Sequence, residues 1–381
     1  MQTLILTMAF SFITVGVVTA ISPLWTRKHL QFGVTFPEDA RLHPKIRALK
    51  KRFFWANLMA TVFFMLPMFA GFLLGYEGEQ HARFLSIMGT GGISALALFG
   101  FFSYVAAHGA AKKIKQAHFP SPTPSGYSPK LMVSTNFRNE KMAVPTGVFV
   151  FWGLGIVALT AFLPFAFWER IPAQIPVHWG ADGEITRWAD KSIRSVLMLP
   201  LFQLLIFPVL VWANHALKKS KQVLDPKRAQ VSMEQNQAFR LAWSRFLVFT
   251  GLSTLGIFLA LQTATLFAIQ SANFILWGTL IWMAALTFYA VKISVKYGQG
   301  GEKWQPKGAA PIASQEPGIL DNDNFWKLGL FYYNPSDPAI YVERRFGIGV
   351  TFNFARWQAW AMTGAIALLC VISILIPVRM M

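Results

Sequence analysis

The sequence predicts an all-α polytopic integral membrane protein with about eight transmembrane helices and a small β-hairpin element in its last cytoplasmic loop. Three observations predict this class. Of the 381 residues, 54% are hydrophobic and only 14% are charged, a composition typical of chains whose solvent is lipid. Eight charge-free apolar runs are long enough to cross a bilayer core about 30 Å thick. Basic residues cluster in alternate connections between those runs, a distribution that orients membrane proteins.

Each predicted span contains roughly 20 apolar residues, the number that a helix rising 1.5 Å per residue needs. The eight runs are, in chain order, Leu4–Trp25, Phe53–Gly75, Phe84–His108, Thr146–Trp168, Ser195–Asn214, Phe246–Ile269, Phe274–Val291 and Trp357–Pro377. The chain start lacks the basic residues of a secretory signal, so we expect the first run to be a retained span. The runs hold no internal Asp, Glu, Lys, Arg or His side chain, which disfavours a coupled proton or ion pump.

The charge of the connections predicts the orientation. Of the 35 lysines and arginines, 29 fall in residues 26–52, 109–145, 216–245 and 292–356. Because basic residues are retained on the cytoplasmic side, these connections are predicted inside and both termini extracytoplasmic. The net charge of +18 is then an orientation signal. It gives no reason to expect direct binding of nucleic acid.

Recognisable catalytic and metal-binding motifs are missing from the sequence. The seven histidines form no H-E-x-x-H pattern, and neither a P-loop nor a G-x-S-x-G motif is present. The single cysteine, Cys370, excludes an intrachain disulfide and a site made of several thiolates. We therefore expect no enzymatic activity, no cofactor and no metal.

Residues 169–194 form the only predicted outer connection with enough sequence for a site. Its prolines and glycines predict a structured turn region. A His-Trp pair beside carboxylates could recognise a cationic or amphipathic peptide by stacking or cation–π contact. Alternatively, the rings anchor the loop at the headgroups, or His178 ligates a metal or serves a membrane enzyme together with Asp182 or Glu184. The ligand-binding candidates are His178, Trp179, Gly183, Glu184, Trp188 and Lys191.

The last inner connection divides into two parts. Residues 293–320 are rich in Gly, Pro, Ala and Lys, which predicts a flexible linker. In residues 321–356, the β-forming runs Leu330–Tyr333 and Ala339–Glu343 flank an NPSDP turn, a pattern that predicts a hairpin. An isolated hairpin is marginal in water, so we expect its aromatic face to rest on the bilayer or another loop. A docking surface for a cytoplasmic protein is the alternative.

Two Phe-Gly segments echo each other although they lie at opposite ends of the sequence. Phe32–Pro37 follows the first predicted span, and Phe346–Phe352 precedes the last. If the echo is meaningful, the two segments should pack together at the inner face.

Two parts of the chain resemble known domains. Ile175-Pro176, His178-Trp179, Gly183-Glu184, Arg187-Trp188 and Lys191-Ser192 resemble the external loop of the SdpI-type membrane proteins, although that family usually has Pro-Asp where this chain has Ile185-Thr186. A second segment of about 35 residues resembles a small domain of unknown function that often accompanies the first. Its matching residues form a cytoplasmic motif of Trp326, Gly329, Tyr332, Asn334, Pro335, Asp337, Pro338, Arg345, Gly347, Gly349 and Asn353.

The resemblance implies a bacterial plasma (inner) membrane protein without enzymatic activity. It implies immunity to, or sensing of, a peptide toxin, with signal transduction through the cytoplasmic face. The expected partners are the lipid bilayer, an extracytoplasmic peptide toxin and a cytoplasmic regulator. The alternative is a transporter or flippase for an apolar or lipidic substrate, because proline and glycine mark several spans. The predicted units are residues 1–145, 146–214 (the SdpI-like unit), 215–292, 293–320, 321–356 and 357–381.

Overall fold

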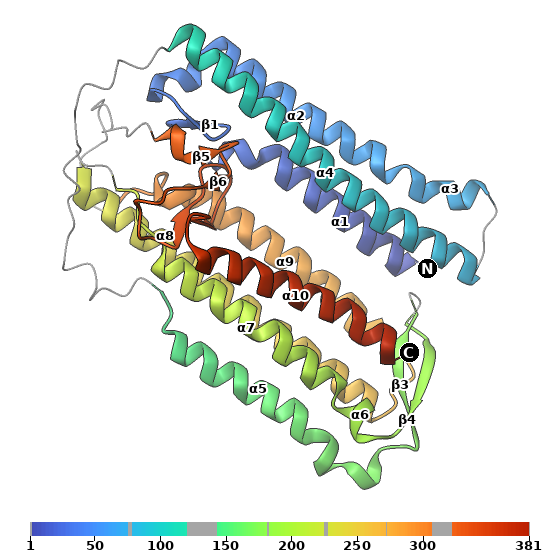
Figure 1. Cartoon of the computed structure of the whole chain (residues 1–381). Helices are drawn as coiled ribbons and strands as arrows, with labels where there is room; N and C mark the ends of the chain where they lie inside the picture. Colours follow the sequence, from blue (N-terminus) through green and yellow to red (C-terminus); the bar gives the residue numbers. More distant parts are fainter. Residues whose placement is uncertain are drawn as a thin grey trace.

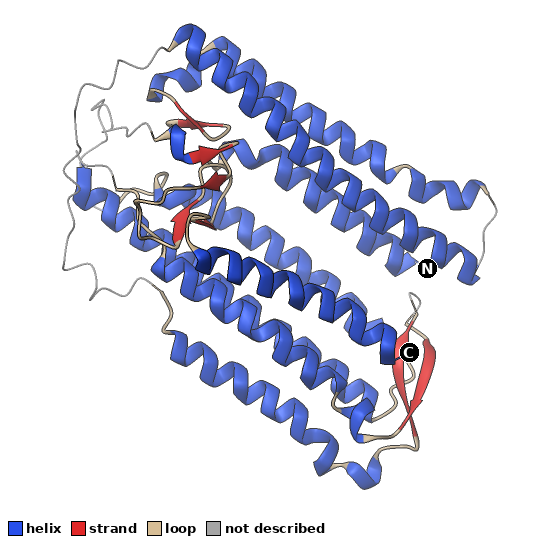
Figure 2. Ribbon diagram, viewed as in Figure 1, coloured by secondary structure: helices blue, strands red, loops and turns tan. Residues whose placement is uncertain are grey.

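The computed structural model describes residues 2–74, 78–119, 143–180, 183–224, 228–271, 273–306 and 322–380. Long helices lie side by side, with short strand pairs at the two ends of the bundle (Figures 1 and 2). The helices are α1 (Gln2–Ile21), α2 (Pro44–Met65), α3 (Pro67–Leu73), α4 (Gly78–His118), α5 (Thr146–Ala166), α6 (Ile193–Val196), α7 (Met198–Lys219), α8 (Ala229–Leu266), α9 (Asn273–Tyr297) and α10 (Trp357–Met380). Short 3-10 helices cover Ser22–Leu24, Glu38–Leu42, Trp168–Arg170, Gln299–Gly301 and Asp323–Phe325.

The predicted all-α membrane architecture is confirmed. Within the described ranges, seven helical segments are long and apolar enough to cross a membrane: Leu4–Leu24, Pro44–Gly71, Arg83–His118, Thr146–Ala166, Ile193–Lys219, Ala229–Leu266 and Asn273–Gly301. Each contains most or all of one predicted run. The eighth run lies in α10, a helix of 24 residues that packs against α7.

Three helices continue well beyond the apolar runs. α2 begins at Pro44 rather than Phe53, α4 ends at His118 rather than His108, and α8 begins at Ala229 rather than Phe246. The extensions carry lysine, arginine, glutamine and alanine, which are good helix formers, and proline is well tolerated at the first helical position of α2. Hydropathy therefore marks the apolar part of each helix and misses its polar continuation.

The helices form two groups. α1, α2 and α4 pack together, and α5, α7, α8 and α9 make the second group (Figure 1). Buried amides connect neighbouring helices, as in the hydrogen bonds from Gln203 Nε2 to Thr160 Oγ1 at 3.2 Å and to the Leu255 carbonyl oxygen at 3.0 Å. Such bonds satisfy polar groups that lipid could not.

The strand pairs define the two ends of the bundle. β3 (Gln174–Trp179) and β4 (Ile185–Asp190) lie at the end of the bundle where α1 begins and α10 ends, and we call this the hairpin end (Figure 1). Residues 322–356 lie at the opposite end, and we call them the module. We call that end of the bundle the module end. The strands there are β1 (Leu30–Gln31), β2 (Val34–Thr35), β5 (Trp326–Lys327), β6 (Phe331–Tyr332), β7 (Tyr341–Glu343) and β8 (Val350–Phe352).

The start of the predicted flexible linker is ordered. α9 continues to Tyr297, and the turn Gln299–Gly301 is buried against α8. Gly301 has φ +83°, and a side chain there would collide with the backbone of Gln235, so glycine at this position permits close contact rather than flexibility. Residues 307–320 of the predicted linker lie outside the described residues.

Candidate functional site

The β3–β4 hairpin is an antiparallel pair with a defined turn. Its register pairs Gln174 with Asp190 and Pro176 with Trp188. Gly183 has φ +81°, and a side chain there would collide with Asn273. The turn and this close approach account for glycine at position 183.

The root of the hairpin is fixed to the helices. Its apolar part is a cluster of buried residues, Ile171, Ile175, Val196 and Leu266. Lys191 Nζ donates hydrogen bonds to the carbonyl oxygens of Trp168 at 3.1 Å and Ile171 at 3.0 Å, and lies 5.0 Å from the centroid of the Trp168 ring. Lys191, a predicted ligand-binding residue, thus holds the hairpin to the segment that follows α5.

The exposed face of the hairpin carries an aromatic ring and an imidazole. Trp188 is 41% exposed, and Thr186 is two residues away on the same face of β4. His178 Nδ1 lies 2.5 Å from Thr186 Oγ1 across the strand pair, which fixes the orientation of the ring. The half-buried Trp179 has a buried indole N–H with no hydrogen-bond partner among the described residues, and such a donor costs about 1–3 kcal/mol.

The structure therefore separates the six predicted outer residues. His178 and Trp188 share the exposed face, and Glu184 is exposed at the turn. Lys191 is part of the root. Asp182 lies outside the described residues. Nowhere in the described ranges are three His, Cys, Asp or Glu side chains grouped so that they could hold a metal ion.

The module contains two short hairpins rather than the single one predicted. β5 pairs with β6, and β7 pairs with β8, so the prediction that residues 330–333 pair with residues 339–343 is wrong. A parallel bridge between Tyr332 and Asn353 joins the two hairpins. The NPSDP turn, with Pro335 and Pro338, connects them and takes its shape from side-chain hydrogen bonds.

Asn353 organises that turn from a fully buried position. Its Oδ1 accepts a hydrogen bond from the backbone N–H of Asn334 at 3.0 Å. Its Nδ2 donates to the backbone carbonyl oxygens of Asn334 at 2.9 Å and Asp337 at 3.0 Å. The Asp337 carboxylate accepts from the Tyr332 hydroxyl at 2.9 Å and from Lys221 Nζ at 2.7 Å. Burial alone would raise the pKa of Asp337, but hydrogen bonds, led by that from Lys221, hold it below its ordinary value.

Arg345 connects the module to the loop between α1 and α2. Its guanidinium pairs with Asp323 and donates to the side chain of Asn322. It also donates to the carbonyl oxygen of Gly33 at 3.0 Å and lies 5.2 Å from the centroid of the Trp326 ring. The motif residues Arg345 and Trp326 are therefore in direct contact.

Asp323 extends this connection to α4. Its carboxylate accepts from Lys115 Nζ at 2.8 Å and from Thr35 Oγ1 at 2.7 Å, in addition to the pair with Arg345. Burial alone would raise the pKa of Asp323, but the hydrogen bond from Lys115 and the charge of Arg345 hold it below its ordinary value.

The two Phe-Gly segments pack together, as their echo predicts. The rings of Phe32 and Phe346 stack with centroids 5.8 Å apart. The first segment also meets the turn between β5 and β6: Gly33 and Gly329, with φ +78° and +67°, lie backbone to backbone, and a Cβ on Gly33 would lie 2.8 Å from Gly329 Cα. The Tyr104 hydroxyl donates to the carbonyl oxygens of Phe32, at 3.2 Å, and of Leu328 in that turn, at 3.0 Å.

Glu343 fastens the module to α8. Its buried carboxylate pairs with Arg27, accepts from Asn236 Nδ2 at 2.7 Å and lies 3.7 Å from Arg240 Nη2. Arg240 is only 1% exposed. Its guanidinium also donates, at 2.8–3.1 Å, to the carbonyl oxygens of Leu217, Lys218 and Ser220.

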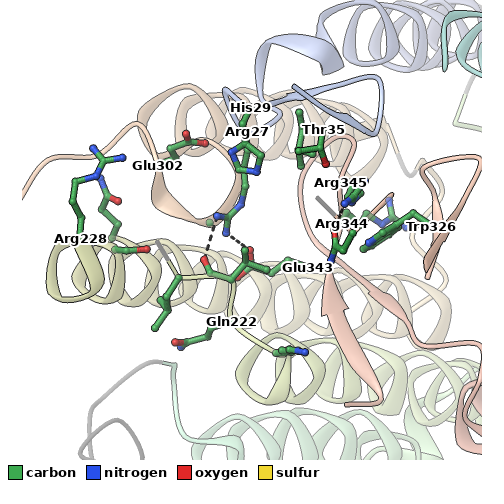
Figure 3. A pocket seen from close by; sticks show the side chains of 18 of the residues that line it. Arg27, His29, Thr35, Gln222, Arg228, Glu302, Trp326, Glu343, Arg344 and Arg345 are labelled. Carbon is green, nitrogen blue, oxygen red and sulfur yellow. Dashed lines mark hydrogen bonds and ion pairs between the residues drawn. The ribbon is translucent and has the colours of Figure 1, made fainter. Parts of the chain in front are cut away.

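A basic pocket of about 220 Å³ lies beside Glu343 (Figure 3). Its walls come from the loop after α1, the α7–α8 connection, the start of α8, the turn after α9 and the module. The ionisable lining residues are Arg27, His29, Lys221, Arg228, Glu302, Glu343, Arg344 and Arg345. Of these, only Arg345 belongs to a motif that the sequence singled out. The others come from distant segments, and no spacing marks them as a set.

An apolar cavity of about 870 Å³ lies between the two helix groups at the module end. Helices α1, α7, α8, α9 and α10 and the module residues 346–352 line it. Aromatic rings from several elements form much of the wall, among them Trp25, Trp212, Phe239 and Phe352. The cavity is thus a hydrophobic space with the module at one side.

The comparisons with known proteins match two parts of the chain, each to a family without an assigned function. Residues 155–204 match the model described as Domain of unknown function (DUF1648), a range that contains the β3–β4 hairpin. Residues 335–360 match the model described as Family of unknown function (DUF5808), a range that contains β7, β8 and the start of α10. No curated protein and no solved structure matches the chain. The chain is therefore a membrane protein that contains these two domains of unknown function.

Proposed function

We propose that this protein is a non-enzymatic membrane sensor that detects, or confers immunity to, an extracytoplasmic peptide. In this proposal the β3–β4 hairpin lies outside the bacterial plasma membrane and receives the peptide. The module lies inside and conveys the event to a cytoplasmic regulator.

The observation that carries the proposal is that one helix contacts both regions. Near the hairpin end of α8, Gln262 Nε2 donates to the carbonyl oxygen of Val196 at 2.8 Å. Near the module end of the same helix, Asn236 and Arg240 hold Glu343. With 38 residues, α8 is about 57 Å long at 1.5 Å per residue, enough to cross a bilayer and project beyond it. A shift at the hairpin root would therefore displace the residues that hold the module.

The exposed face of the hairpin suits an extended cationic or amphipathic peptide. Trp188 can stack on aromatic groups or contact a cation, and Glu184 and Asp190 are exposed carboxylates nearby. A two-stranded sheet also has strand edges whose backbone groups can pair with an added peptide strand.

The experiment is survival of a sensitive bacterial host that expresses the full chain and is challenged with a panel of purified secreted peptide toxins. We expect protection against at least one peptide, and loss of that protection in Trp188→Ala at equal membrane abundance. The matched control is Trp152→Ala, because Trp152 is an exposed tryptophan on the membrane-spanning helix α5. Failure to protect against any peptide would contradict immunity.

Transmission of peptide binding from the hairpin to the module needs a separate measurement. Hydrogen exchange of the module, in protein reconstituted into nanodiscs, should change when the protective peptide is added. An unchanged module beside a protected hairpin would contradict transmission while leaving peptide binding intact.

A second candidate, transport of a lipidic molecule, is favoured by the 870 Å³ apolar cavity. Proteoliposomes containing the protein and a fluorescent lipid would test it. Lipid movement faster than in protein-free vesicles would support transport, and an unchanged rate would exclude it for that lipid.

A further inference from the structure

Arg344 occupies an unusual position between the two cavities. Among the described residues it alone lines both the basic pocket and the apolar cavity. Figure 3 shows it beside Arg345 and Trp326 in the wall of the basic pocket. Its side chain therefore marks the boundary between a polar space and a hydrophobic one.

In the part of the chain that the structure describes, no opposite charge balances that of Arg344, whereas both of its sequence neighbours form ion pairs. Arg345 pairs with Asp323, and Glu343 pairs with Arg27. Arg344 makes no ion pair within the described ranges, and its side chain makes one hydrogen bond there, from Nε to the carbonyl oxygen of Val350 at 3.2 Å.

Arg344 is an exposed residue that lines both cavities, so its guanidinium is accessible to a ligand. Nearby protein lowers the pKa of Arg344 by partial desolvation, and no carboxylate opposes the effect. A bound anion would supply a counter-charge and accept bidentate hydrogen bonds.

The apolar cavity supplies the other half of a site. Its volume, about 870 Å³, lies within the range of about 300–1,000 Å³ found for small-molecule sites. Trp25 and Trp212 line it near helix ends, where tryptophans mark the headgroup level of a membrane. A soluble anion would fill only the basic pocket, while a molecule with an acyl chain can use both spaces.

We propose that Arg344 and the apolar cavity form a binding site for an anionic phospholipid from the membrane leaflet at the module end. The phosphate lies against the Arg344 guanidinium, and acyl-chain segments occupy the cavity between the helix groups. The lipid also touches residues 346–352, which connects the occupancy of the site to the position of the module. Binding alone is meant here, and it does not require that the lipid be moved across the membrane.

The test is native mass spectrometry of the purified full-length protein titrated with phosphatidylglycerol or with phosphatidylcholine of the same acyl chains. We expect the wild type to bind phosphatidylglycerol at least about tenfold more tightly than phosphatidylcholine. A tenfold ratio corresponds to about 1.4 kcal/mol of binding free energy. Arg344→Gln should lose this preference, and Arg344→Lys should keep most of it. Arg47→Gln is the matched control, because Arg47 is exposed and lines neither cavity.

Two further arms separate the lipid from other anions and from poor folding. Ala213→Phe narrows the apolar cavity and should weaken retention of both lipids, with unfolding temperatures confirming that each variant is folded. Excess inorganic phosphate or glycerol 3-phosphate should not displace the lipid. Complete displacement by either anion, equal retention of the two lipids by the wild type, or unchanged preference in Arg344→Gln would overturn the proposal.

Discussion

Arg345 Nη1 donates a hydrogen bond to the carbonyl oxygen of Gly33 at 3.0 Å, although the two residues lie 312 positions apart in sequence. This bond joins the loop after the first helix to the module that precedes the last. A partly buried ion pair and a buried one connect the same module to α4 and α8, respectively. The module is therefore an integral part of the bundle, and its stability should depend on contacts with several helices.

Gly33→Ala should destabilise the protein. The residue has φ +78°, and its backbone touches that of Gly329, so a methyl group adds a steric clash to about 1–2 kcal/mol for the left-handed conformation. Thermal unfolding in detergent measures the effect. Gly109→Ala is the control, because Gly109 is in α4 with open space around its Cα, and alanine favours a helix by up to about 1 kcal/mol. Equal stability of the two variants would contradict the packing described here.

Glu343→Gln should cost about 3–5 kcal/mol, because it leaves the buried guanidinium of Arg240 without its nearby carboxylate. Chemical unfolding in detergent, followed by tryptophan fluorescence, measures the loss. Glu234→Gln changes a carboxylate on the same helix that has no described side-chain partner, so it should have little effect. A loss in Glu343→Gln no larger than that in Glu234→Gln would be inconsistent with the docking role.

Acidification should weaken the attachment of the module at Asp323. Because the folded-state pKa of Asp323 lies below its ordinary 3.8, the stabilisation is fully present above that ordinary value and is lost as the pH falls through the folded value. The unfolding temperature of the wild type, compared with that of Asp323→Asn between about pH 6 and pH 3, measures this effect. The difference in unfolding temperature between the wild type and Asp323→Asn should shrink on acidification. A difference that stays constant or widens would mean that the carboxylate contributes nothing through its charge.

Lys191→Met should loosen the β3–β4 hairpin. The substitution removes hydrogen bonds to two carbonyl oxygens at the root, each worth about 1.5–3 kcal/mol because the donor is charged. Hydrogen exchange of residues 174–190 should speed up in this variant. Arg194→Met, at an exposed position without a described side-chain partner, should leave exchange unchanged. If the hairpin of Lys191→Met exchanges at the wild-type rate, Lys191 does not anchor it.

The sequence predicted the features that depend on local composition. Apolar runs identify membrane helices because lipid requires a minimum length, and the Phe-Gly echo correctly predicted the contact between Phe32 and Phe346. Several residues of the second motif, such as Asn353 and Arg345, prove to organise the module and its contacts. Motif resemblance singled out these residues without indicating which partners they contact.

Long-range polar contacts could not be predicted from the sequence. Glu343, Arg240 and Arg27 meet from three distant segments, and nothing in their local sequence indicates the others. The wrong strand pairing has a similar cause. The NPSDP turn suggested a hairpin between its two flanking strands. Instead, buried hydrogen bonds from Asn353 hold the turn, and the flanking strands β6 and β7 pair with β5 and β8.

The most direct test asks on which side of the membrane each region lies, because the proposed sensor needs the hairpin outside and the module inside. Single cysteines are placed in a Cys370→Ser background at Thr186, on the exposed face of the hairpin, and at Tyr333, which is 49% exposed in the module. A membrane-impermeant maleimide applied to intact cells should label Thr186→Cys and should label Tyr333→Cys only after lysis. Labelling of Tyr333→Cys in intact cells, with Thr186→Cys protected until lysis, would contradict the proposed function.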